Sequence, residues 1–222
     1  VVHTLTAAYN YDGTTFSAIT GTWAASAADQ LVRFVAFPTG GTLYLCRVNE
    51  ANELDIWSGR GSFTSPSGSP PKARDLCVTN SRVVLGHTTD SATNPYQVRW
   101  CDFLDINSWT TGTNNTAELS ETLGVIVGIT ALGPLSCDVY KDDSIWVGQA
   151  VAAKNPFQFQ LVGFVPGPTS PAAIIPYRNN QYWLGLDGVI YAFDGARTNV
   201  VSAGLITTIR ETFAWDLRSR AH

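Results

Sequence analysis

The residues that could carry catalytic chemistry are few in this chain of 222 residues, and they are widely spaced. Of the three histidines, His3 and His222 lie at the ends of the sequence, and His87 directly follows an apolar run that ends at Gly86. That position favours a strand-end residue over a general base. No G-x-S-x-G, H-E-x-x-H, P-loop or G-x-G-x-x-G sequence is present. The sequence therefore predicts no catalytic residues, and we expect the chain not to be an enzyme.

Acidic residues gather at two places without forming a recognisable site. Asp138, Asp142 and Asp143 are close in sequence, but the last two fall in a predicted tight turn, where Asp is favoured because it bonds the local backbone. Their spacing differs from the alternating Asp/Asn loop that binds calcium and ends in Glu, so calcium is a minor alternative. Asp102 and Asp105 could be drawn as a glycosidase pair, although any acidic protein offers such pairs. No metal and no cofactor is predicted.

The four cysteines show no metal-binding pattern. Neither a C-x-x-C pair nor another zinc-ligand spacing is present, and each cysteine sits in an apolar or strand-like run. We interpret them as buried thiols that act as small hydrophobic side chains. A disulfide between any two of them stays open at this point; the residues are Cys46, Cys77, Cys101 and Cys137.

Tryptophan and tyrosine could instead form stacking platforms for sugars, because the chain has seven Trp and eight Tyr. Trp57, Trp100, Trp146 and Trp183 fall inside predicted strands, however, where Trp packs in a core more often than it binds a ligand. A sugar-binding module that acts in host receptor recognition is therefore the alternative function, and not the first.

Composition excludes some classes of partner. The net charge is −4, only 14% of residues are charged and no basic block occurs, which argues against a protein that reads nucleic acid along a charged face. A channel through which DNA merely passes needs no basic wall. No run approaches the roughly 18 apolar residues of a membrane span, so stable membrane insertion is not expected. The lack of methionine indicates an internal stretch of a longer protein or the loss of a start Met, and we expect the former.

One pattern recurs along the chain: an alternating strand, a tight turn, and a second short strand. The turn positions Asp12, Ser58 and Asp105 are separated by 46 and 47 residues, and Asp194 follows after 89, with a weaker copy at Phe157–Val165 between them. A period of about 45 residues matches one four-stranded blade of a β-propeller.

Hairpins that are more apolar than these copies alternate with them along the chain. A sheet with two apolar faces cannot bury both alone, so stacked sheets that cover one another are expected. We predict an all-β fold, a β-propeller or partial propeller of four-stranded blades over residues 1–203 with a partial first blade; stacked sheets or a β-sandwich are the alternative. The predicted hairpins pair 31–37 with 42–46, 75–78 with 82–86, 135–140 with 144–148, and 173–177 with 181–185.

Residues 204–222 differ in character and form a separate segment. Apolar residues at Leu205, Ile206, Ile209 and Phe213 have helical spacing. The pattern predicts a short amphipathic C-terminal helix, either packed on the edge of the sheets or available to a partner.

Four segments carry a resemblance to a known family. Residues 96–109 match a V-x-W-S-x-x-x-D-x-x-x-W segment, 126–133 an I-V-G-I-x-x-L-G strand, 137–146 an L-x-V-F-K-x-x-S-I-Y hairpin, and 183–195 a final-blade pattern. Together they resemble the nozzle or distal tail-tube proteins of short-tailed bacteriophages. Cys101 stands where that family often has Ser, and no platform or tail-tip domain is visible.

The resemblance implies a structural virion protein. It implies a ring of copies of the chain, a hexamer, that contacts other tail proteins such as the adaptor and the fibres. DNA would leave through this ring without sequence-specific binding. The protein would be assembled in the host bacterial cytoplasm and located in the phage tail.

Overall fold

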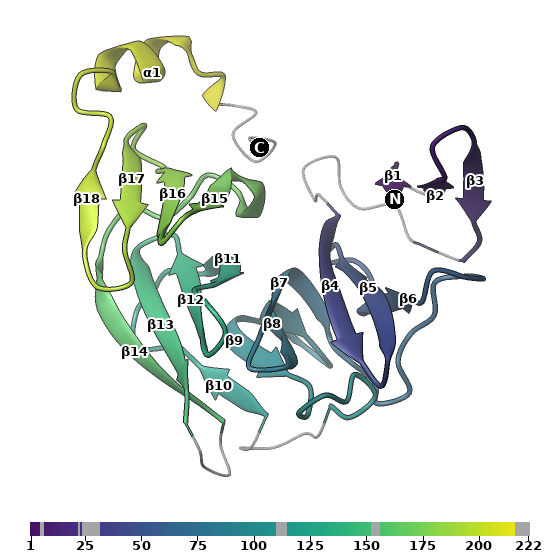
Figure 1. The fold of residues 1–222 in the computed structure, drawn as a ribbon. Coiled ribbons are helices and arrows are strands. Elements are labelled where there is room, and N and C mark those ends of the chain that lie inside the picture. The colour runs from purple at the N-terminus through teal and green to yellow at the C-terminus, as the bar shows by residue number, and fades with distance from the viewer. Residues whose placement is uncertain (5–6, 22, 24–31, 110–114, 152–155, 216–222) are drawn as a thin grey trace.

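The structure, a computed structural model, describes residues 1–4, 7–21, 23, 32–109, 115–151 and 156–215. The described chain is all-β: five antiparallel sheets and a short α-helix. The sheets follow one another along an arc, and in sheets 2 to 5 the first strand lies toward the inside of the arc (Figure 1). The predicted all-β class is therefore confirmed.

Every sheet is a meander, because its strands pair in the order in which they occur in the chain. Sheets 1 and 2 have three strands each. Sheet 1 comprises β1 (Val2–His3), β2 (Ala8–Tyr11) and β3 (Phe16–Ile19), and sheet 2 comprises β4 (Arg33–Thr39), β5 (Thr42–Val48) and β6 (Asp55–Trp57).

The remaining sheets have four strands each. Sheet 3 comprises β7 (Lys72–Thr79), β8 (Arg82–Thr89), β9 (Thr93–Trp100) and β10 (Thr116–Glu118); sheet 4 comprises β11 (Ile126–Ala131), β12 (Ser136–Lys141), β13 (Ser144–Ala150) and β14 (Phe157–Phe164); sheet 5 comprises β15 (Ile174–Tyr177), β16 (Asn180–Leu184), β17 (Ile190–Phe193) and β18 (Thr198–Val200).

Tight turns join the first two strands of sheets 2 and 3. Gly40 and Gly41 link β4 to β5, and both have positive φ, at 55° and 76°. Asn80 and Ser81 link β7 to β8 with φ of 47° and 53°. Two successive residues with positive φ give the turn whose twist matches that of a hairpin, and Gly and Asn adopt this conformation at low cost.

The hydrophobic core lies between successive sheets rather than inside any one of them. Each of the four buried clusters joins a sheet to the next one along the chain. The stacking that the sequence predicts is therefore present over the described residues. Representative members are Ala8 and Ile19 with Phe63; Phe37 and Cys46 with Leu76 and Leu85; Val84 and Trp100 with Ile129 and Val139; and Tyr140 and Ile145 with Trp183 and Phe193.

Three of the four predicted apolar hairpins are the first two strands of a sheet, namely β4–β5, β7–β8 and β15–β16. The hairpin predicted at 135–148 exists as β12–β13 but forms the centre of sheet 4, because β11 precedes it.

Two of the recurring copies were wrong in detail. In the copy marked by Asp105, the pattern predicts a strand at 97–103 followed by a second short strand at 105–109. Residues 105–109 instead form turns, since the Asp105 carboxylate accepts the Asn107 N–H at 2.9 Å, and the fourth strand of sheet 3 is β10. The weak copy at 157–165 is the single strand β14, whose side chains alternate in burial without an internal turn.

The predicted C-terminal helix is present as α1 (Ile206–Thr212), shorter than the apolar spacing indicated, and none of its residues is fully buried. It is attached to sheet 5 because the Arg210 Nε donates to the Asp187 carbonyl at 2.7 Å, and Ile206 packs on the cluster between sheets 4 and 5. Among the described residues, no helix is long and apolar enough to cross a membrane.

Close contact between sheets depends on Gly128 in β11. A Cβ at this position would lie 2.6 Å from the Ile174 Cδ1 and 3.3 Å from the Pro171 Cα. We expect Gly128→Ala to lower the free energy of unfolding by about 1–3 kcal/mol, because added volume in a packed interface forces neighbours apart. Urea denaturation measures this change.

Gly163→Ala in β14 is the matched control, because a Cβ there has no atom within 4 Å. Equal effects of the two substitutions would show that the backbone freedom of glycine, and not the packing of sheet 4 on sheet 5, determines the result.

Candidate functional site

The Asp75 carboxylate on β7 joins three sheets. Its side chain is 1% exposed. One oxygen accepts from the Arg33 Nε of β4 at 2.9 Å, and the other accepts the backbone N–H of Ile129 in β11 at 2.9 Å. Because β11 is the first strand of its sheet, this N–H lies on a strand edge that no neighbouring strand covers. Asp75 thus supplies the bond that a further strand would have supplied.

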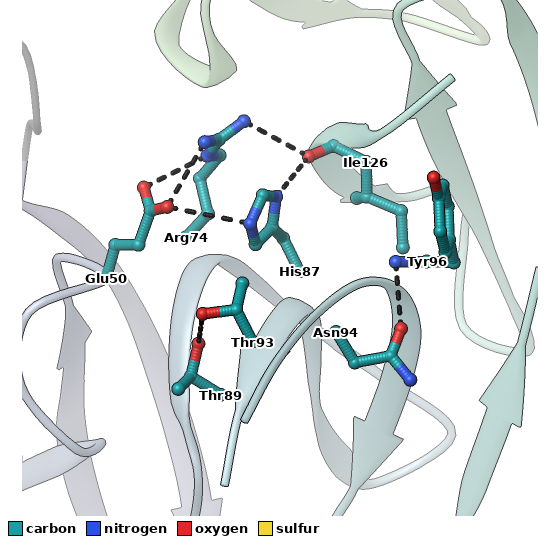
Figure 2. Close-up of polar contacts among 8 residues, drawn as sticks. All are labelled: Glu50, Arg74, His87, Thr89, Thr93, Asn94, Tyr96 and Ile126. Carbon is teal, nitrogen blue, oxygen red and sulfur yellow. Dashed lines mark hydrogen bonds and ion pairs between the residues drawn. The ribbon is translucent and has the colours of Figure 1, made fainter. Parts of the chain in front are cut away.

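A second polar cluster joins the same three sheets and is drawn in Figure 2. Glu50, which follows β5, accepts from the Nε and Nη2 of Arg74 at 3.1 Å each. The Ile126 carbonyl at the start of β11 receives the Arg74 Nη1 at 3.4 Å and lies 3.1 Å from the His87 Nδ1. Two-point contact between Arg and a carboxylate is the stronger kind of ion pair.

His87 is therefore a structural side chain rather than a free base. Burial, and then the positive charge of Arg74, lowers the pKa of His87, so the ring is neutral at pH 7. Since the Ile126 carbonyl can only accept, the proton lies on Nδ1, and Nε2 is left 3.6 Å from the Glu50 Oε1. Both Glu50 oxygens already bind Arg74, which leaves neither group free to activate a nucleophile.

Two residues of this cluster have strained backbones. His87 has φ of 55° and Glu50 has φ of 65°, a region that bulky residues adopt only where their surroundings hold them. The contacts to Arg74 and Ile126 provide that restraint. The bend at His87 coincides with a shift of register between β8 and β9.

A shallow pocket of about 430 Å³ lies beyond this cluster, lined by the segment 90–97 and Glu118. Thr89 donates to Thr93 at 3.3 Å, and the Asn94 side chain accepts the Tyr96 N–H at 3.1 Å (Figure 2). The Tyr96 ring already contacts the Lys141 ammonium, 4.9 Å from the ring centroid. Tyr96 is thus part of the packing between sheets 3 and 4, and it is not an open stacking platform.

Lys141 is fully buried at the end of β12. Its Nζ donates to the Leu119 and Thr122 carbonyls at 2.7 Å each, and burial lowers the pKa of its ammonium. Asp143 accepts the Gly124 N–H at 2.7 Å. Together these bonds hold the 119–125 segment against sheet 4.

The three acidic residues that are close in sequence, Asp138, Asp142 and Asp143, do not form one cluster in the structure. Asp142 and Asp143 lie at the β12–β13 turn, whereas Asp138 is buried beside Gln181 of sheet 5. In the part of the chain that the structure describes, no three His, Cys, Asp or Glu side chains come close enough to hold a metal ion.

Asp102 and Asp105 are also occupied locally. Asp102 accepts from Asn115 at 2.8 Å and from Ser108, and Asp105 binds the Asn107 N–H. The pair that could be drawn as two glycosidase carboxylates therefore stabilises a turn.

The aromatic and sulfur side chains are mostly core residues. Trp100, Trp146 and Trp183 are buried, and the half-buried Trp57 donates to the Gly61 carbonyl at 3.2 Å. All four cysteines are buried free thiols, as one of the two sequence interpretations predicted. Burial raises the pKa of both Cys46 and Cys101 to about 12. The side chain of His3 and all of His222 lie outside what the structure describes.

Sequence reasoning missed Asp75, Arg74, Glu50 and Arg33. The available signal was a charged residue directly before an apolar run, as Asp75 stands before Leu76-Cys77-Val78. Because a buried charge needs a partner, such a residue predicts a contact with another element.

Comparison with models of known protein families gives no match, and comparison with curated proteins gives none either.

The Asp75 bridge yields a first prediction for this site. Asp75→Ala leaves the Ile129 N–H without its acceptor and Arg33 without its ion-pair partner, so we expect the free energy of unfolding to fall by about 2–4 kcal/mol. Glu118→Ala is the control, because Glu118 is the exposed last residue of β10, and it should stay within about 0.5 kcal/mol of the unmodified protein. Equal losses in the two variants would contradict the bridge.

Asp138 yields a prediction about pH. The residue is fully buried beside Gln181, and burial raises its pKa from 3.8 to about 7 even though Gln181 favours the charged form. The folded state thus keeps a proton that the unfolded state releases, so the contribution of Asp138 to stability is full below pH 4 and is lost as the pH rises to 7.

Replacing Asp138 by Asn removes this dependence. We expect Asp138→Asn to gain about 2 kcal/mol or more over the unmodified protein at pH 8 and much less at pH 5, because only the charged carboxylate is penalised. Thermal denaturation at both pH values measures the difference. A gain that does not change with pH would show that Asp138 is not the titrating group.

Proposed function

We propose that the chain is a structural, non-enzymatic component of a bacteriophage tail, a nozzle or distal tail-tube protein whose sheets are the blades of a β-propeller or partial propeller. One observation supports this most directly: ionic groups on the inner strand β7 and in the loop after β5 join sheets. Asp75, Glu50 and Arg74 each have their bonds filled by neighbouring sheets, as a scaffold requires.

The segments that carry the family resemblance support the same proposal. Residues 96–109 comprise the end of β9 and its turn, 126–133 contain β11, 137–146 contain the β12–β13 hairpin, and 183–195 contain β17. They lie in three successive meanders, sheets 3 to 5, and repeated meanders are the arrangement expected of blades.

The partners follow from the same role. Copies of the chain in a ring, a hexamer, would surround an axial channel and contact the adaptor and the fibres of the tail. DNA would pass through without sequence-specific binding, which agrees with the net charge of −4. The protein would act in the virion after assembly in the host cytoplasm.

A cryo-EM reconstruction of the particle that contains this chain tests the proposal. We expect copies arranged in a ring around the tail axis. Copies located singly at a fibre tip, with the 90–97 pocket facing outward, would overturn the conduit role and favour receptor binding; a glycan array would then test sugar binding.

A further inference from the structure

Sheet 1 presents an apolar face on the side away from sheet 2. Side chains that are paired across strands lie on the same face, so Val2, Tyr9, Tyr11, Phe16 and Ala18 share this face, whereas Ala8 and Ile19 pack toward sheet 2. Tyr11 and Phe16 stack with ring centroids 4.6 Å apart. Phe16 is nevertheless 62% exposed and Tyr11 is 49% exposed.

The aromatic pair is held in place before any partner binds. Asp12 accepts the backbone N–H groups of Thr14 and Thr15 at 2.9 Å each, which fixes the β2–β3 turn. The Tyr11 hydroxyl donates to the Gly13 carbonyl at 2.7 Å. Because these bonds restrict the two rings, little conformational entropy remains to be lost when they bind.

Sheet 5 has a matching apolar hollow on the side away from sheet 4. Ile175, Tyr182, Leu184 and Ile190 line a pocket of about 220 Å³, and Phe213, just beyond α1, completes its wall. Ile175 remains 55% exposed. Since an apolar cavity of about 150 Å³ admits benzene, this pocket can receive a phenyl ring.

These two faces resemble the faces that meet at the described junctions between sheets. Each described junction packs an apolar face of one sheet on an apolar face of the next, and most include aromatic rings from one or both sheets. The strands of sheets 1 and 5 contain no Asp, Glu, Lys or Arg, whereas sheets 2 and 3 carry charged residues on most of their strands. An uncharged face against an uncharged pocket leaves no buried ion unpaired.

We propose that the Phe16 ring of one copy of this chain, with Tyr11 stacked beside it, inserts into the Ile175–Phe213 pocket of a second copy. The faces lie at opposite ends of the arc, so the contact is head-to-tail between copies (Figure 1). Repetition of such a contact gives a closed ring or an open chain of copies. The inference rests on the ring-forming role proposed above and names the surface that forms the ring.

Two variants and their mixture test this contact. Phe16→Glu damages the inserting face and Ile175→Glu damages the pocket, and both side chains are exposed enough for the sheets to fold unchanged. Sedimentation velocity over a concentration series should show self-association of the unmodified chain. In each variant alone the dissociation constant should rise at least ~100-fold, because the contact would bury an unpaired carboxylate.

The mixture gives the decisive result. Phe16→Glu keeps an intact pocket and Ile175→Glu keeps an intact inserting face, so equal amounts of the two variants should form a dimer that grows no further. Leu123→Glu is the control: Leu123 is 91% exposed between β10 and β11 and should leave association unchanged.

Three outcomes would overturn the inference. They are a monomeric unmodified chain at every concentration, association that survives in either variant, or a mixture that stays monomeric. A monomeric unmodified chain would also result if the two faces met each other within one copy. None of these results bears on where the chain lies in a virion. The location in the tail is tested separately by the cryo-EM reconstruction.

Discussion

Unpaired strand edges are the constraint on which the rest of the structure depends. Every sheet begins with a strand whose outer edge has no neighbour in its own sheet, and an uncovered N–H there would be costly once the sheets stack. Between sheets 3 and 4, the Asp75 carboxylate accepts such an N–H, that of Ile129. The same carboxylate forms an ion pair with Arg33 of sheet 2. The inner side of the arc is therefore held by directional bonds, while apolar clusters fill the space between the sheets.

These directional bonds occupy the polar side chains of Glu50, Arg74 and His87 near the inside of the arc. A catalytic carboxylate or imidazole must have a free lone pair or proton that faces substrate. Glu50 and His87 instead face Arg74 and the Ile126 carbonyl, and Lys141 donates to carbonyls of the 119–125 segment. The buried charges of Asp75 and Lys141 are stable here because each meets polar partners outside its own strand.

Much of the fold could be predicted from local pattern. The hairpin β7–β8 is recognisable from its apolar runs and its Asn80–Ser81 turn, and the period of about 45 residues indicates successive sheets. Prediction from the sequence failed for features that are determined by tertiary contacts. Nothing local distinguishes β12–β13 as a central pair, and the Asp75 bridge joins residues 54 positions apart. The end faces of sheets 1 and 5 are apparent only when cross-strand register separates their two sides.

The meander topology has a consequence for how the chain acquires its structure. Each strand pairs with the strand just before it, so the pairings within a sheet have low contact order and need only short loops to close. A sheet can therefore form while the residues of the next are still being synthesised. A newly formed sheet still exposes the apolar face that will pack on the next sheet. That face becomes buried when the next sheet forms. Synthesis from the N-terminus thus favours a vectorial order of folding, in which the uncovered sheet face moves along the growing chain.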